Sequence, residues 1–312
     1  MKIFYNTNIP KKYKRAAIAI GNFDGVHRGH QKVFRSTKKF AQEKKTKFGI
    51  LTFTPLPVMF FNKKIQNHRL ASEGEKFKLL KKYGVNFIIN IRFNKNFSQI
   101  EAEKFIKNII YKKINPRLLS VSNNFRFGYK RRGTISLLKK FSKKYNYELV
   151  NTVAFKHNQK IVSSTRIREC LKSGKINLAN KLLSRNWFID GLVEKGKQLG
   201  RKLGYRTCNI YIKNYILPKL GVYAVKVMIG NNNRIYEGAA YLGSRPTFRG
   251  KEVFLEINIF GINKNLYKKR LRVYFVKFIR NDKKFNNSLE LVRQMNKDVY
   301  FIKKGLKAKL AL

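Results

Sequence analysis

Short apolar runs alternate with stretches of helical periodicity in the first half of the chain. The apolar runs predict strands at 16–20, 47–53, 86–91, 117–121 and 147–153. Apolar residues at helical spacing predict helices near 30–45, 73–83, 98–112 and 135–145. This alternation favours a parallel sheet with helices on both faces, in which ligands bind at the carboxyl ends of the strands.

The pattern of apolar and polar positions changes near residue 184. A short helix is predicted at 175–183, just before the change. Closely spaced strands follow it, at 191–193, 222–229, 234–242, 252–260 and 271–278, and a final helix is predicted around 288–298. Several short strands in succession favour a small antiparallel barrel. We therefore predict two domains, at 1–184 and 185–312.

Length and composition are those of a folded, two-domain protein. The chain has 312 residues, of which 43% are hydrophobic, enough to bury two cores. No apolar run approaches the roughly 18 residues of a membrane span. The N-terminus lacks the apolar core of a secretory signal, so we expect a cytoplasmic protein that is not bound to membrane. The cysteines, Cys170 and Cys208, are too far apart in the sequence to indicate a disulfide framework or a zinc site.

The chain is strongly basic, with a formal net charge of +54 from 70 Lys and Arg against 16 Asp and Glu. One hypothesis is a nucleic-acid-binding protein, which would lose affinity steeply as salt rises. The basic residues are spread over the whole length instead of forming a tail or a single basic helix, which favours a solvated surface and no nucleic-acid partner. Because acids are scarce, an acid inside a candidate site is informative.

A glycine-rich turn joins the first predicted strand to the first predicted helix. It reads Gly21-Asn-Phe-Asp-Gly-Val-His-Arg-Gly-His30 and contains half of the 4 histidines. Unpaired N–H groups and the positive end of the helix dipole make such a turn suitable for phosphate. The ring N–H donors of His27 and His30 are placed to stabilise charge that develops on a phosphate.

This turn resembles the H-x-G-H signature of nucleotidylyltransferases, and the longer run resembles the branch that forms flavin nucleotides. The resemblance implies that His27 and His30 are catalytic. It also implies that ATP phosphates are bound by Gly21, Asn22, Asp24 and Gly29. After the second strand, the family usually has an acid and a histidine where this chain has Thr54 and Leu56.

Further stretches follow the order of the same family. The run Asn123-Asn-Phe-Arg-Phe-Gly128 resembles its D/N-F-x-F-G turn, which with the second strand implies a flavin site at Phe53, Asn124, Phe125 and Phe127. Val162-Ser-Ser-Thr-Arg-Ile-Arg168 resembles its S-S-T-x-x-R signature. The hydroxyls and the guanidinium of this signature suit polyphosphate, which implies phosphate binding by Ser164, Thr165 and Arg168.

The second half carries a basic glycine-rich stretch from Gly196 to Asn209 that resembles the riboflavin kinase run G-x-x-x-G-R-x-L-G-F-P-T-A-N. The match implies ATP binding by Gly196, Gly200, Arg201 and Gly204. It also implies magnesium binding by Thr207 and Asn209, whose neutral oxygen atoms suit a magnesium–phosphate complex. Arg206 and Cys208 stand where the family has proline and alanine.

Glu256 lies in a run of strand-like alternation, Glu252-Val-Phe-Leu-Glu-Ile-Asn-Ile-Phe260, on the face opposite the aliphatic residues. In riboflavin kinases the matching glutamate is the proposed base, so the resemblance implies that role for Glu256. The segment Arg280-Asn-Asp-Lys-Lys-Phe285 resembles the family's R-x-E-x-K-F, with Asp282 for the usual glutamate, and implies a flavin contact at Arg280.

The chain is thus identified as a member of the bifunctional riboflavin kinase/FAD synthetase family. The implied fold is α/β: a Rossmann-like nucleotidylyltransferase domain with a parallel sheet, followed by a small antiparallel flavokinase barrel with a C-terminal helix. The implied reactions convert riboflavin to FMN and FMN to FAD, with ATP as co-substrate, flavins as substrates and products, and Mg²⁺ as the metal. Because several motif residues depart from the family, a chain that retains only one activity is the alternative; the sequence does not indicate the oligomeric state.

Overall fold

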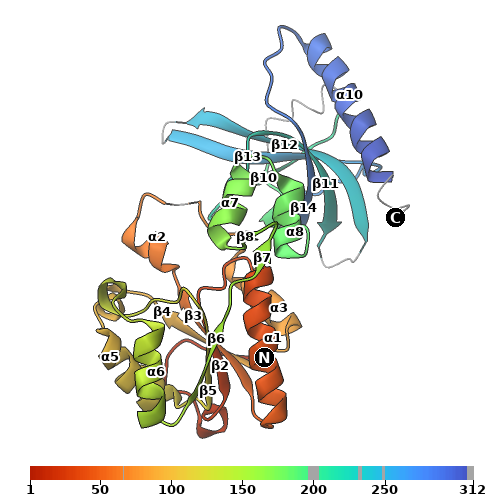
Figure 1. Ribbon diagram of the computed structural model, residues 1–312. Helices are drawn as coiled ribbons and strands as arrows, with labels where there is room; N and C mark the ends of the chain where they lie inside the picture. The colour runs from red at the N-terminus through yellow and green to blue at the C-terminus, as the bar shows by residue number, and fades with distance from the viewer. Residues whose placement is uncertain (66, 196–203, 231–233, 248–249, 308–312) are drawn as a thin grey trace. The chain divides into compact units, whose positions relative to one another are not determined.

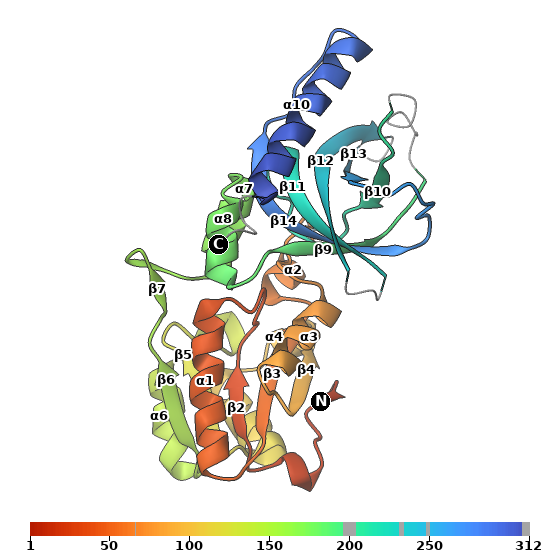
Figure 2. The ribbon, with the colours of Figure 1, turned by 90° about the vertical axis from the view of Figure 1, so that its right-hand side faces the viewer.

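The computed structural model describes residues 1–65, 67–195, 204–230, 234–247 and 250–307 (Figures 1 and 2). The chain forms two compact units. The first comprises Met1–Gln66 and Ser72–Ser164, and the second comprises Asn67–Ala71 and Thr165–Leu312.

The first unit is built on a six-stranded sheet in which every strand pair is parallel. The strands lie in the order β1-β4-β3-β2-β5-β6. Their bounds are β1 Lys2–Phe4, β2 Ala17–Ile20, β3 Phe48–Thr54, β4 Phe87–Arg92, β5 Leu118–Ser122 and β6 Glu148–Thr152. The predicted strands and their parallel pairing are confirmed. The short β1 was missed because three residues, none of them fully buried, give no usable alternation.

Helices cover both faces of this sheet. The first unit contains α1 Arg28–Glu43, α2 Pro57–Phe61, α3 Glu73–Lys82, α4 Lys95–Ser98, α5 Ala102–Lys104, the π-helix η2 Phe105–Ile114 and α6 Ile135–Lys144. Short 3₁₀ turns lie at Lys11–Tyr13 and Tyr129–Arg131, and a small hairpin is formed by β7 Lys156–His157 and β8 Lys160–Ile161. The helix predicted near 98–112 is divided into α4, α5 and η2, since the chain turns between Ser98 and Ala102.

Alternate residues of the buried strands supply two separate cores. On one face, Ile18 and Leu51 pack with Ile106 of η2 and Leu138 of α6. On the other face, the neighbouring strand residues pack with α1 and α3, among them Phe34, Phe77, Leu80, Ile50 and Ile88. Both cores hold the sheet rigidly, so the loops at its carboxyl edge start from fixed positions.

The strand order reverses direction at β2. From β2 the chain proceeds through β3 to β4 on one side, and then returns to place β5 and β6 on the other side. Because the loops after β2 and β5 leave in opposite directions, a crevice forms between them at the carboxyl edge. The glycine-rich turn after Ile20 and the aromatic turn after Ser122 border this crevice.

The second unit contains a six-stranded antiparallel sheet that curls into a nearly closed barrel. The order is β10-β13-β12-β11-β14-β9. The bounds are β9 Phe188–Leu192, β10 Cys208–Tyr211, β11 Gly221–Ile229, β12 Ile235–Thr247, β13 Gly250–Ile259 and β14 Arg270–Arg280. The N–H of Glu194, just after β9, donates to the carbonyl oxygen of Asn209 in β10 at 2.9 Å, which joins the two ends of the sheet.

Helices α7 Ser164–Lys172 and α8 Ile176–Leu183 precede the barrel, and α10 Ser288–Lys307 follows it. The amide of Asn180 in α8 donates to the carbonyl oxygen of Phe275 in β14 at 2.9 Å. Ile302 and Leu306 of α10 pack on outward residues of the strands, including Val222 and Val276. The antiparallel barrel and the final helix are confirmed, and the helix extends further than the predicted 288–298.

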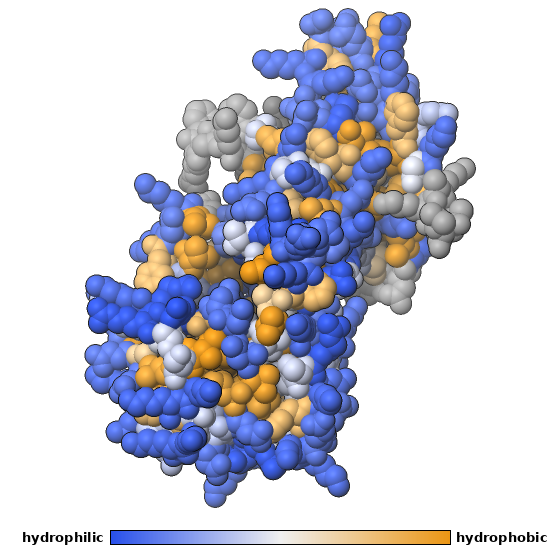
Figure 3. Space-filling model, in the orientation of Figure 1, coloured by the Kyte–Doolittle hydropathy of each residue, from blue (hydrophilic) through white to orange (hydrophobic). Residues whose placement is uncertain are grey.

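Hydrophilic side chains cover much of the face seen in Figure 3, with smaller hydrophobic patches between them. Among the residues whose burial is described, Lys76 is the one lysine or arginine that is buried. The described ion pairs include exposed pairs within a helix, such as Lys39–Glu43 at 3.8 Å. The positive charge therefore lies mostly in contact with solvent.

Replacing Gly49 with alanine is expected to destabilise the first unit by about 1–3 kcal/mol, because it overpacks the sheet. A Cβ at this position would lie 2.4 Å from Cζ of Phe87 and 2.7 Å from Cδ1 of Ile18, both in the core. Chemical denaturation measures the change. Gly74→Ala is the control, since a Cβ there meets nothing within 4 Å, and it should leave stability equal or raise it by up to about 1 kcal/mol.

Candidate active sites

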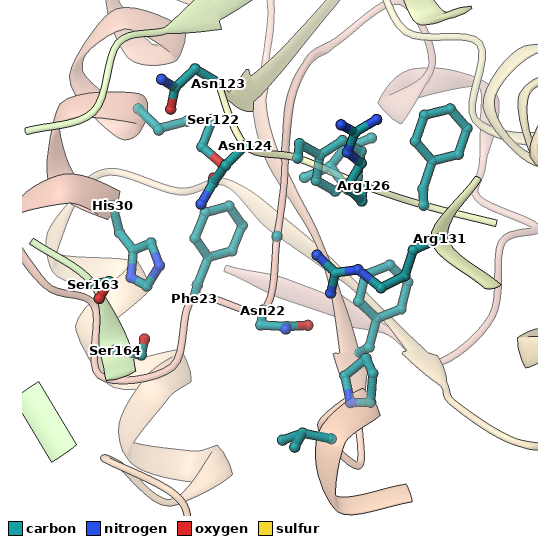
Figure 4. A pocket seen from close by; sticks show the side chains of 18 of the residues that line it. Asn22, Phe23, His30, Ser122, Asn123, Asn124, Arg126, Arg131, Ser163 and Ser164 are labelled. Carbon is teal, nitrogen blue, oxygen red and sulfur yellow. The ribbon is translucent and has the colours of Figure 1, made fainter. Parts of the chain in front are cut away.

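A cavity of roughly 940 Å³ opens in the first unit at the carboxyl edge of the sheet (Figure 4). Its lining comes from the loops that follow β2, β4, β5 and β6, together with the end of β3 and the start of α1. The predicted site residues in the lining are Gly21, Asn22, His27, Gly29, His30, Phe53, Asn124, Phe125, Phe127 and Ser164. Segments far apart in the sequence thus meet at one cavity.

The two histidines lie together at the start of α1. His27 is the N-cap residue, and its Nδ1 accepts a hydrogen bond from the backbone N–H of His30 at 3.4 Å. The two rings stack with centroids 3.5 Å apart and planes at 22°. A Cβ on Gly29 would lie 3.0 Å from Cε1 of His27 and 3.1 Å from the carbonyl oxygen of Val162, so a larger residue would press on the His27 ring. Both rings border the cavity beside the positive end of the helix dipole.

Another part of the cavity is strongly aromatic. Phe53 packs against Phe93 and Phe97, with ring centroids 6.1 and 5.6 Å apart. Phe97 contacts Phe105, which contacts Phe127, and Phe127 stacks on Phe125; the centroids of these pairs are 6.2, 5.4 and 5.6 Å apart. All of these rings line the cavity. No sequence motif pointed to Phe93, Phe97 or Phe105, although Phe93 lies two residues after a predicted strand.

Some predicted phosphate-binding residues lie elsewhere. Asp24 is buried and is not part of the cavity lining, while its carbonyl oxygen accepts a hydrogen bond from the Ser164 hydroxyl at 2.9 Å. Asp24 therefore fixes the position of Ser164. Thr165 and Arg168 belong to the second unit, in α7, where Nε of Arg168 donates to the carbonyl oxygen of His68 at 2.8 Å.

Thr54, which stands where the family has an acid, belongs to a polar group at the start of α3. Its hydroxyl donates to the carboxylate of Glu73 and lies 3.0 Å from Oδ1 of Asn90. Leu56 is buried. A carboxylate is thus present near this position, on Glu73, although the sequence motif lacks one.

The second unit gathers oxygen atoms around Glu256. In the barrel register, Glu256 of β13 lies directly opposite Asn209 of β10 on one side and Tyr241 of β12 on the other. Directly opposite residues share a face of the sheet. The hydroxyl of Thr207 donates to Oε1 of Glu256 at 2.6 Å. The predicted base and the predicted metal ligands therefore lie together on one face of the barrel.

The segment before β10 is held although it lacks the family's proline. The carbonyl oxygen of Arg206 accepts from Nδ2 of Asn258 at 2.8 Å, and its guanidinium donates to the carbonyl oxygen of Asn263 at 2.8 Å. These bonds position Thr207. Cys208, which replaces the family's alanine, is a free thiol whose pKa is raised to about 11 by burial, so it is a poor nucleophile.

The C-terminal end of β14 adds charged groups near the same face. Nε of Arg280 donates to both carboxylate oxygens of Asp298 in α10, at 3.0 and 2.9 Å. Tyr241 hydrogen-bonds to the side chain of Asp282. Burial raises the pKa of Tyr241 to about 12, and the charges of Asp282 and Glu256 act in the same direction. Arg280, the predicted flavin contact, is thus engaged by α10.

The predicted ATP-binding residues Gly196, Gly200 and Arg201 lie outside the described residues. Gly204 is described and has a φ of +79°. Among described residues, no group of three His, Cys, Asp or Glu side chains is placed to hold a metal ion. The neutral oxygen donors of Thr207 and Asn209, beside the Glu256 carboxylate, instead suit magnesium, which takes few protein ligands and keeps phosphate and water oxygens.

Comparison with known proteins matches the two halves of the chain to two different families. The FAD synthetase family model matches residues 9–166, and the riboflavin kinase family model matches residues 183–306. A bifunctional riboflavin kinase/FMN adenylyltransferase from Buchnera aphidicola of Schizaphis graminum is 39% identical over 95% of this chain and 96% of its own. The Escherichia coli K12 protein of the same name is 32% identical over 90% of both chains.

A crystal structure reported as a macrolide-efflux protein from Streptococcus pneumoniae superposes with a TM-score of 0.85 at 27% identity, covering 96% of this chain and 98% of that one. In the described part of this chain, no helix has the length and apolarity to cross a membrane. Matches to two family models in order, and identity over most of the length, show that the chain belongs to the bifunctional riboflavin kinase/FMN adenylyltransferase family.

Proposed function

We propose that this chain phosphorylates riboflavin to FMN with its barrel and then joins FMN to the adenylyl group of a second ATP with its N-terminal sheet domain. The observation that carries this proposal is the presence of two separate groups of functional side chains. One surrounds the cavity of the first unit, and the other surrounds Glu256 in the second. The riboflavin kinase match begins at residue 183, which supports placing the functional boundary near residue 184.

In the kinase reaction, the carboxylate of Glu256 takes the proton from the terminal ribityl hydroxyl. That oxygen attacks the γ-phosphate of ATP, and ADP leaves in line. The Thr207 hydroxyl donates to one carboxylate oxygen, which leaves the other free to accept the proton. Thr207 and Asn209 would hold magnesium, which neutralises charge on the transferring phosphate. Gly196, Gly200, Arg201 and Gly204 are the proposed ATP contacts of this site, with Arg280 as a flavin contact.

In the adenylyl-transfer reaction, a phosphate oxygen of FMN attacks the α-phosphorus of ATP, and pyrophosphate leaves. His27 and His30 donate hydrogen bonds to the phosphate oxygens as negative charge grows on them. The N-terminus of α1 adds its unpaired N–H groups. Phe53, Phe125 and Phe127 stack with or border the isoalloxazine ring, and Asn124 contacts it.

The remaining phosphate contacts of this reaction are proposals as well. They are Gly21, Asn22, Gly29 and Ser164, which line the cavity, while Asp24 acts by holding the Ser164 hydroxyl. Direct transfer agrees with the chemistry of the cysteines, because burial raises the pKa of both Cys170 and Cys208. We also propose the cytoplasm, where ATP is supplied, as the location of both reactions.

A time course with riboflavin, ATP and Mg²⁺, followed by chromatographic separation of the flavins, tests this function. FMN should appear first and FAD should follow at its expense. If FMN accumulates and supplied FMN is not converted, only the kinase is retained. If riboflavin is untouched while supplied FMN gives FAD, only the adenylyltransferase is retained. Absence of both products would reject the proposed function.

Replacing Thr207 with valine removes one hydroxyl at nearly constant volume. We expect riboflavin phosphorylation to fall by about 10- to 100-fold and to need more Mg²⁺ for half-maximal rate, since the proposed ligand and the bond to Glu256 are both lost. Magnesium titrations of the initial rate measure this effect. FAD formation from supplied FMN serves as the internal control and should be unchanged. An unaltered magnesium requirement would remove Thr207 from the proposed metal ligands.

A further inference from the structure

The basic loop, Phe125–Gly133, follows the aromatic part of the cavity in the first unit. Its side chains Arg126, Lys130 and Arg131 line the cavity, and none was assigned a role by motif. No aspartate or glutamate is among the described residues that form this lining. The cavity therefore offers positively charged donors to a ligand, and none of its own described lining residues is a carboxylate that would neutralise them.

The backbone of the basic loop is held at both ends. Phe127 and Gly133 exchange hydrogen bonds, from the N–H of each to the carbonyl oxygen of the other, at 3.2 and 2.8 Å. The N–H of Tyr129 donates to the carbonyl oxygen of Ile100 at 2.7 Å. Between these points, Lys130 and Arg131 have φ values of 50° and 60°, a conformation that non-glycine residues adopt only when their surroundings impose it. The backbone path of the loop from Phe127 to Gly133 is consequently set by the fold.

Arg126 and Arg131 lie across the cavity from the residues proposed to bind phosphate. Figure 4 shows His30, Ser163 and Ser164 on one side and the two guanidinium groups on the other, with Asn22 and Asn124 between. Neither arginine belongs to an ion pair in the described part of the chain. Lys130 differs, since its Nζ lies 5.4 Å from the centroid of the Tyr129 ring. The two arginines are thus the donors available to a ligand at this end.

We propose that Arg126 and Arg131 recognise the edge of the isoalloxazine ring that carries its nitrogens and carbonyl oxygens. This inference rests on the proposed adenylyl-transfer function of the cavity. The phosphate of FMN must approach the histidines, where the transfer occurs, so the ring extends toward the phenylalanines and the basic loop. There the apolar dimethylbenzene edge packs among aromatic rings, and the guanidinium forks donate to the oxygen and nitrogen acceptors of the opposite edge.

Competitive inhibition by lumiflavin tests this inference in the full-length chain, because lumiflavin has the isoalloxazine ring but neither ribityl chain nor phosphate. FAD formation from supplied FMN is measured for the wild type, Arg126→Gln and Arg131→Gln. We expect the KM for FMN and the inhibition constant of lumiflavin to rise together by about tenfold in each variant, which is the loss expected for a charged hydrogen bond. The KM for ATP should not change.

Arg132→Gln is the matched control, since Arg132 lies in the same loop, is exposed and does not line the cavity. It should leave both constants unchanged. A raised KM for FMN with unaltered lumiflavin inhibition would assign the arginines to the phosphate and overturn the inference. Unaltered constants in both variants would also overturn it. Failure of the wild type to form FAD would instead reject the proposed function itself.

Discussion

Glu256→Gln is expected to reduce FMN formation by about 100- to 10,000-fold, the range contributed by a positioned general base. Glutamine keeps the size of the side chain and retains an oxygen for the Thr207 hydroxyl, which donates to Glu256 at 2.6 Å, but it cannot accept the ribityl proton. FAD formation from supplied FMN should persist, because that reaction uses the cavity of the other unit. Flavin chromatography after separate incubations with riboflavin and with FMN measures both rates.

Glu237→Gln is the matched control for this variant. Glu237 is also a strand glutamate of the barrel, but it lies opposite Lys226 in the register of β11 and β12, away from Thr207 and Asn209. It should retain both activities. Equal loss of FMN and FAD formation in Glu256→Gln would contradict two separate sites and would point to general damage of the fold.

His30→Ala is expected to give the converse result, a loss of FAD formation of about 100- to 1,000-fold with riboflavin phosphorylation intact. This is the range found when one preorganised donor to a developing oxyanion is removed. The His30 ring lines the cavity and stacks on His27, so its removal also frees the second ring. Initial rates with FMN and ATP measure the effect.

His157→Ala provides the comparison, because His157 lies in the β7–β8 hairpin of the same unit and is not part of the cavity lining. Normal FAD synthesis in His30→Ala would refute the catalytic assignment of this histidine. A parallel loss in His157→Ala would show that the first unit is merely sensitive to substitution.

The sequence was most informative where local chemistry and local geometry coincide. The strand, glycine turn and helix around His27 and His30 need one another within a few residues, so their order alone predicts a phosphate site. The same holds for the alternation around Glu256, which places its carboxylate opposite the aliphatic face of β13. These features are fixed by neighbours in the chain.

Features that depend on distant contacts were harder to predict. Phe97 and Phe105 join the aromatic part of the cavity only because the helix predicted near 98–112 turns between Ser98 and Ala102. Strand β10 was not predicted, because its residues end a basic glycine-rich stretch without clear alternation and its partner β13 is far away in the sequence. The bond between Asp24 and Ser164 likewise spans 140 positions.

Charge was the least specific guide. The net charge of +54 describes a surface on which most basic side chains meet water, and it does not distinguish the arginines of the cavity from the others. Arg126 and Arg131 line the cavity whereas Arg132 does not, although all three lie in one loop. The sequence alone therefore could not identify these two arginines as cavity residues.

Asn209 connects the architecture of the barrel to its chemistry. Its carbonyl oxygen accepts the hydrogen bond from Glu194 that joins β9 and β10, the two ends of the sheet. Its side chain lies on the same face as Glu256, directly opposite it. Without that contact β10 would be an edge strand held by β13 alone, with Asn209 still opposite Glu256. A nucleotide bound beside Asn209 would add contacts to this weakly held strand, so ligand binding should raise the unfolding temperature of the second unit.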